Sequence, residues 1–217
     1  MVKVKICGIT NARDARTAIK AGADFLGLNF YSGSPRYVSP GAARRIVKAG
    51  PRGARWIGVF VNEEPARVLE IAHAVGLLEV QLHGEESPDA VAELRCELPV
   101  IKAIRVRGAL DAATLKRFVR ADALLLDGFD KSARGGTGKT FNWKIARRVG
   151  GKRRIFVAGG LNAENVSEAI RVARPYAVDI CSGVESTSPR KKDAKKIAAL
   201  MAAVRAASAP KKRSKRK

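Results

Sequence analysis

Short apolar segments recur along the whole chain, and a stretch with helical periodicity separates each one from the next. The apolar segments are rich in β-branched side chains, which is typical of buried strands. The stretches between them place apolar residues three and four positions apart, as amphipathic helices do. The pattern predicts strands at residues 2–7, 24–30, 55–61, 79–82, 100–104, 123–127, 154–158 and 177–181.

The predicted helices carry start signals of their own. Ser39-Pro40, Glu64-Pro65 and Ser87-Pro88 each place a proline at a first helical position, and Asn142 and Asn162 are suitable caps. The sequence predicts helices at residues 13–21, 41–49, 65–75, 88–94, 111–119, 142–149, 162–173 and 192–206.

Strict alternation of strands and helices implies an all-parallel sheet of the α/β class. The strands recur about 20 to 30 residues apart, the length of one βα unit. Eight such units without a second domain favour closure into a single-domain (β/α)8 TIM barrel. An open, doubly wound sheet is the alternative. We expect the barrel to span residues 1–207 and a basic, disordered tail to follow at residues 208–217.

In a TIM barrel the chemistry lies at the carboxyl ends of the strands. The ends of the predicted strands carry a thiol, an imidazole, a guanidinium and a carboxylate, which together suggest a catalytic site. The strand-end positions are Cys7, Asn29, Asn62, His83, Arg105, Asp127, 158–160 and 181–183.

Two glycine turns follow the seventh and eighth predicted strands. Gly159-Gly160 and Ser182-Gly183 can bring backbone N–H groups close to an anion. The loops after these two strands are the frequent phosphate site of TIM barrels. The turns therefore predict a phosphorylated small molecule as substrate.

A third glycine-rich segment, residues 135–138, follows Asp127. A nucleotide-binding P-loop is rejected there because Ala133 stands where that motif needs glycine. The P-loop would also have to join strand and helix directly, whereas residues 128–134 intervene. We expect a mobile lid over the site.

Several motifs, taken in order, resemble phosphoribosylanthranilate isomerase. They are KICGIT at 5–10, FYSGSPRYV at 30–38, QLHG at 81–84, LLLDGFD with GGTGKTFNW between 124 and 143, AGGLNAENV at 158–166 and SGVE at 182–185. The similarity runs from residue 3 to about residue 205. It implies a TIM-barrel isomerase of tryptophan biosynthesis that uses no cofactor and no metal.

The resemblance also implies residue roles. The family converts N-(5′-phosphoribosyl)anthranilate to 1-(2-carboxyphenylamino)-1-deoxyribulose 5-phosphate by an Amadori rearrangement, which needs one acid and one base. Cys7 matches the base, whose thiol would need nearby Lys or Arg to ionise, and Asp127 matches the acid. Arg36 matches the residue that grips the anthranilate carboxylate. Expected substrate contacts are His83, Asp179, Gly159, Gly160, Ser182 and Gly183.

Simpler interpretations exist for these residues. A cysteine is most often a small buried apolar group, a strand-end Asp can cap a helix, and His83 can simply satisfy backbone groups. Cys181 stands where the family pattern usually has serine. A related sugar-phosphate isomerase of histidine biosynthesis is the alternative enzyme, but that family would have an aspartate in place of Cys7.

Charge and cysteine content add a second alternative function. The net charge is +22, and the chain without residues 210–217 still holds 36 basic against 20 acidic side chains. The tail could therefore bind nucleic acid non-specifically. Three cysteines without metal-ligand spacing, no signal peptide and no membrane-length apolar run predict a cytoplasmic protein. We expect a monomer or a homodimer.

Overall fold

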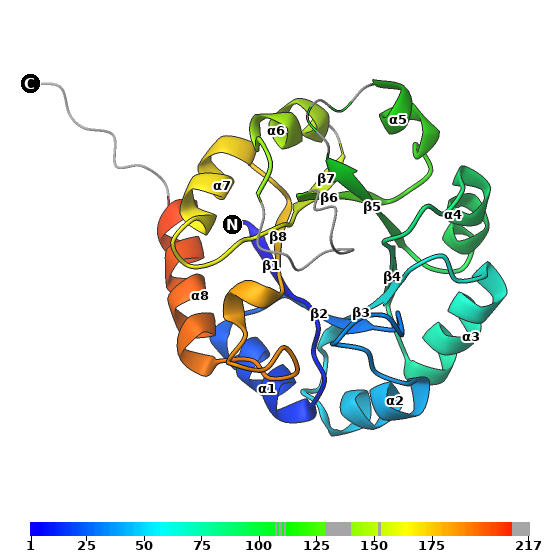
Figure 1. Cartoon of the computed structure of the whole chain (residues 1–217), viewed down its shortest axis with the longest axis horizontal. Helices are drawn as coiled ribbons and strands as arrows, with labels where there is room; N and C mark the ends of the chain where they lie inside the picture. Colours follow the sequence, from blue (N-terminus) through cyan, green and yellow to red (C-terminus); the bar gives the residue numbers. More distant parts are fainter. Residues whose placement is uncertain (107, 109, 111, 129–139, 152, 210–217) are drawn as a thin grey trace, which may run out of the picture.

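Eight parallel strands close into a barrel, and the helices surround it (Figure 1). The computed structural model describes residues 1–106, 108, 110, 112–128, 140–151 and 153–209. This architecture confirms the predicted (β/α)8 barrel. The strands are β1 (Lys3–Ile6), β2 (Phe25–Asn29), β3 (Arg55–Phe60), β4 (Glu79–Leu82), β5 (Val100–Val106), β6 (Ala123–Gly128), β7 (Arg154–Val157) and β8 (Ala177–Ile180).

Each strand is followed by the helix that the periodicity predicted. Serine side chains cap two of these helices: Ser39 accepts a hydrogen bond from the Ala42 amide and Ser87 one from the Ala90 amide. The helices are α1 (Ala12–Ala21), α2 (Pro40–Ala49), α3 (Pro65–Val75), α4 (Pro88–Arg95), α5 (Ala112–Arg117), α6 (Lys144–Gly150), α7 (Val166–Ala173) and α8 (Ala194–Ser208).

Two predicted helix starts are wrong by a few residues. Helix α6 begins at Lys144 rather than at residue 142, and α7 begins at Val166 rather than at residue 162. The side chain of Asn162 accepts hydrogen bonds from the Glu164 and Asn165 amides. An asparagine that bonds the backbone in this way holds a turn, so the helix starts only after it.

Apolar side chains fill two separate regions. Inside the barrel, Phe25, Ile57, Ile101, Leu125 and Phe156 are buried against one another. A larger apolar layer lies between the sheet and the helices. It includes the strand side chains that point out of the barrel, such as Leu124 and Leu126. Because strand residues alternate between the two faces, every second residue of a strand points into the barrel.

Closure between β1 and β8 joins the two ends of the chain. Their register pairs Lys5 with Asp179 and Ile6 with Ile180, and the amide of Cys7 donates to the Ile180 carbonyl at 2.8 Å. Cys7 and Cys181 therefore stand next to each other at the end of this strand pair. Residues 174 positions apart in sequence share one site because of this register.

The predicted boundary at residue 207 falls inside α8, which continues to Ser208. Residues 210–217 of the predicted tail and the predicted lid at residues 135–138 lie outside the described residues. None of the helices described is long and apolar enough to cross a membrane.

Candidate active site

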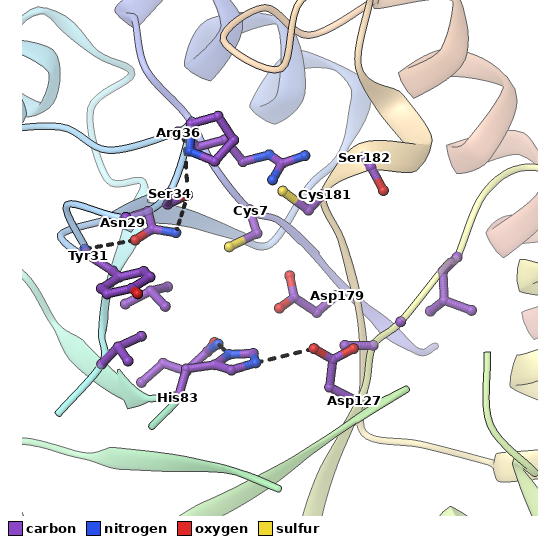
Figure 2. A pocket seen from close by; sticks show the side chains of 18 of the residues that line it. Cys7, Asn29, Tyr31, Ser34, Arg36, His83, Asp127, Asp179, Cys181 and Ser182 are labelled. Atoms are coloured by element: carbon purple, nitrogen blue, oxygen red, sulfur yellow. Dashed lines mark hydrogen bonds and ion pairs between the residues drawn. The ribbon is translucent and has the colours of Figure 1, made fainter. Parts of the chain in front are cut away.

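A pocket of about 870 Å³ opens at the carboxyl ends of the strands. Figure 2 shows Cys7, Cys181 and Arg36 on one side of it, His83 and Asp127 on the other, and Asp179 between them. Its position at the carboxyl ends of the barrel strands is that of a small-molecule site. The structure gathers all but one of the predicted site residues there: Cys7, Arg36, His83, Asp127, Gly159, Gly160, Asp179 and Ser182 line the pocket, and Gly183 does not.

The Cys7 thiol lies in surroundings that favour its ionised form. A hydrogen bond from Cys181 is the largest influence, and together with the charges of Lys5 and Lys192 it outweighs burial and holds the pKa of Cys7 well below its usual value. The pKa of Cys181 is raised in turn, since Cys181 keeps the proton that it shares with Cys7. Within this pair, ionisation of Cys7 is therefore favoured over ionisation of Cys181.

Lys5 and Asp179 form a buried ion pair below the two cysteines. Lys5 Nζ lies 2.8 Å from Asp179 Oδ2, and Lys5 is completely buried. Burial raises the pKa of Asp179 to about 7, although the Lys5 charge opposes this. The second carboxylate oxygen, Oδ1, is buried and has no hydrogen-bond partner among the described residues. Asp179 also lines the pocket.

Asp127 lies at the end of β6, where only 3% of its surface is exposed. His83 Nε2 lies 3.2 Å from Asp127 Oδ2, and His83 Nδ1 lies 2.8 Å from Gln81 Nε2. The predicted acid is thus connected to β4 through an imidazole. The same His83 side chain that contacts Asp127 also lines the pocket.

Arg36 reaches the pocket from the loop after β2, and the carboxylate of Glu185, which follows β8, binds its guanidinium group. Its Nε and Nη2 atoms donate to the two oxygens of Glu185 at 2.7 and 2.8 Å, and these bonds raise the pKa of Arg36. Lys192 Nζ contacts the same carboxylate at 2.9 Å. A bidentate pair fixes the guanidinium plane. Among the described residues, the remaining nitrogen of Arg36, Nη1, has no hydrogen-bond partner.

The two glycine turns meet at the far side of the pocket. Gly159 and Gly160 have φ angles of 87° and 63°, a left-handed conformation that glycine adopts without strain. A Cβ atom on Gly183 would lie 2.0 Å from the carbonyl oxygen of Leu161, so only glycine fits there. Gly183 thus lets the loops after β7 and β8 pack together, and it does not line the pocket itself.

Sequence reasoning missed four polar residues of this site: Lys5, Gln81, Glu185 and Lys192. Two of them could have been predicted from strand periodicity. Lys5 and Gln81 precede Cys7 and His83 by two residues and so share a strand face with them. Glu185 belongs to the SGVE motif, but neither its contact with Arg36 nor that of Lys192 with Glu185 could be predicted, since both depend on the folded β8 loop.

The described residues contain no group of three or more His, Cys, Asp and Glu side chains placed to hold a metal ion. What the fold and the pocket define is a small (β/α)8 enzyme with a thiol–lysine cluster, a histidine-bound acid and a pair of joined glycine turns.

Comparison with known proteins places the chain within this class. The family N-(5′-phosphoribosyl)anthranilate (PRA) isomerase matches residues 4–203. An N-(5′-phosphoribosyl)anthranilate isomerase of Pelobacter propionicus is 50% identical over 197 residues, which cover 91% of this chain and 92% of the relative. The chain belongs to the N-(5′-phosphoribosyl)anthranilate isomerase family, and the resemblance seen in the motifs is confirmed.

Solved structures agree with this assignment. The phosphoribosyl anthranilate isomerase of Thermus thermophilus is 37% identical, with a TM-score of 0.86 over 94% of this chain and 99% of that one. A second isomerase, in complex with reduced 1-(o-carboxyphenylamino)-1-deoxyribulose 5-phosphate, is 40% identical, with a TM-score of 0.80 over 95% and 100%.

Proposed function

We propose that the chain isomerises N-(5′-phosphoribosyl)anthranilate to 1-(2-carboxyphenylamino)-1-deoxyribulose 5-phosphate in tryptophan biosynthesis. The observation that carries this proposal is the division of the pocket. An ionisable thiol lies beside two lysines on one side, and an acid bound to a histidine lies on the other. An Amadori rearrangement needs one base and one acid at separate positions on the sugar.

Asp127 acts first, as the general acid. It gives its proton to the furanose ring oxygen while the bond from that oxygen to C1′ breaks. The nitrogen lone pair forms the C1′=N bond, and the ring opens to an iminium ion. Asp127, nearly buried at the end of β6, becomes a carboxylate in a site of low dielectric.

Cys7 acts second, as the general base. Its thiolate takes the proton from C2′, the C2′–H electrons form the C1′=C2′ bond, and the C=N electrons return to nitrogen. The resulting enol then becomes the ketone as its oxygen loses a proton and C1′ gains one. The hydrogen bond from Cys181 and the charges of Lys5 and Lys192 depress the pKa of Cys7, which favours the thiolate that this step needs.

Binding roles follow from the remaining contacts. Arg36 Nη1 binds the anthranilate carboxylate while Glu185 holds the other side of the guanidinium. The unpaired Oδ1 of Asp179 accepts a hydrogen bond from a sugar hydroxyl. Backbone N–H groups of the turns at Gly159, Gly160 and Ser182 bind the phosphate, and Gly183 joins the two turns.

The related isomerase of histidine biosynthesis is disfavoured because a thiol, not a carboxylate, lies at the end of β1. Non-specific nucleic-acid binding by residues 210–217, cytoplasmic location, the absence of a cofactor and a monomeric or homodimeric state stay predictions. The basic tail is tested by its removal: DNA affinity that falls steeply with salt and disappears without the tail would support that second function.

The proposed function is tested by turnover of freshly generated phosphoribosylanthranilate, followed by anthranilate fluorescence. We expect an active wild type and losses of about 10²- to 10⁴-fold in kcat for Cys7→Ser and for Asp127→Asn. Cys96→Ser, which removes an exposed thiol at the end of α4, is the matched control and should retain activity. A folded but inactive wild type would contradict the proposed function, and full activity of either site variant would contradict that residue's role.

A further inference from the structure

A chain of three side chains connects β4 to the acid on β6. Gln81 and His83 lie on the same face of β4, and Asp127 lies at the end of β6. Gln81 Nε2 is 2.8 Å from His83 Nδ1, and His83 Nε2 is 3.2 Å from Asp127 Oδ2. Gln81 is almost completely buried, and it lines the same pocket.

The direction of these hydrogen bonds follows from the amide of Gln81. Gln81 directs its amide nitrogen, which can only donate, at Nδ1 of His83; in this orientation Nδ1 accepts and the ring proton lies on Nε2. Nε2–H then donates to Oδ2 of Asp127. Gln81 therefore selects the tautomer of His83, and that tautomer directs a donor at the acid.

Packing alone does not explain an amide at residue 81. Gln81 Oε1 is buried without a hydrogen-bond partner among the described residues, and a buried polar atom without a partner lowers stability. An apolar side chain of similar length would fill the space without this penalty. The function that the amide performs in the described structure is its hydrogen bond to His83.

We propose that Gln81 is a positioning residue whose amide holds His83 in the Nε2–H tautomer, so that His83 stabilises the carboxylate formed when Asp127 gives up its proton. This inference rests on the proposed acid role of Asp127. The hydrogen bond strengthens as negative charge develops on Asp127, and it therefore stabilises the transition state more than the ground state. The other tautomer would turn a lone pair toward the developing carboxylate and would oppose the proton transfer.

The tautomer can be observed directly, because the chain has only two histidines. Long-range ¹H–¹⁵N correlation spectra of the full-length protein give separate signals for a protonated and an unprotonated ring nitrogen. His73→Gln, on the exposed side of α3, assigns the His83 signals and leaves the pocket unchanged. We expect a protonated Nε2 and an unprotonated Nδ1 for His83.

Two substitutions then separate positioning from packing. Gln81→Met keeps the approximate volume without the donor, and a mixture of His83 tautomers should appear. Gln81→Glu places an acceptor beside Nδ1, and the ring proton should move to that atom. Both variants should lower kcat by about tenfold or more while KM stays near the wild-type value. A purely structural role would lower thermal stability and leave the tautomer unchanged.

A His83 ring protonated on Nδ1 in the wild type would overturn the inference. So would a Gln81→Met variant that keeps the wild-type tautomer, whatever its kcat. Failure of the proposed function gives a different result: if Asp127→Asn retained full turnover, the acid role would be wrong while the tautomer spectrum of His83 remained as predicted.

Discussion

In the proposed mechanism, the two sides of the pocket control protons by different physical means. On the β1–β8 side, full charges surround the thiol: Lys5 is completely buried and Lys192 approaches Cys181 Sγ at 3.9 Å. On the β4–β6 side, the acid contacts a histidine that an uncharged amide holds. Nearby positive charges favour the ionised form of the proposed base, whereas a directed N–H group would assist the proposed acid as its proton leaves.

The strongest test of this contrast removes the buried cation. Lys5→Met should lower kcat/KM by about 100-fold or more, because Cys7 loses the charge that favours its thiolate. Breaking a buried ion pair should also lower the free energy of unfolding by about 3–5 kcal/mol. Steady-state kinetics and urea unfolding measure the two effects.

The matched control is the double variant Lys5→Met with Asp179→Asn, which leaves no unpaired buried carboxylate. We expect this variant to recover most of the stability and little of the activity. Recovery of both would mean that Lys5 serves only to pair with Asp179.

The glycine turns offer a second test, of phosphate binding apart from proton transfer. Gly183→Ala would force a Cβ atom against the Leu161 carbonyl oxygen and push the two loops apart. We expect KM to rise about tenfold and stability to fall by about 1–3 kcal/mol. Gly41→Ala on α2 is the control, because its Cβ would meet nothing closer than 3.8 Å and alanine favours a helix. An unchanged KM in Gly183→Ala would show that these two loops do not contribute to substrate binding.

A smaller effect concerns the dependence of stability on pH. The pKa of Asp179 is about 7 in the folded protein against an ordinary value of 3.8, so between these values the folded state keeps a proton that the unfolded chain has released. Stability should therefore fall as pH rises from about 4 to about 7. Asp179→Asn should make this part of the profile flatter in urea unfolding at a series of pH values. Parallel profiles for wild type and variant would contradict the shift.

The barrel and the location of its site were predictable from sequence for a physical reason. Buried parallel strands are nearly continuous apolar runs, and their carboxyl ends bring Cys7, His83 and Asp127 to one face of the barrel. The expected catalytic roles came from the family motifs, because a cysteine such as Cys7, considered without its motif, is usually an inert apolar group.

The partners of these residues could not be predicted in the same way. The pairs Lys5–Asp179 and Arg36–Glu185 each join segments about 150 or more residues apart, and they depend on how β1 closes on β8. The late starts of α6 and α7 have a local cause, since an asparagine can cap a helix or hold a turn that precedes it.

The most direct test of the divided pocket is the pH dependence of Cys7 alkylation by iodoacetamide, measured by mass spectrometry in a Cys96→Ser background. We predict that Cys7 reacts as a thiolate well below the usual pKa of a thiol. In Lys5→Met the titration should move to higher pH, and in Gln81→Met it should not move. A Cys7 that titrates like an ordinary thiol, or that responds equally to both substitutions, would contradict the account.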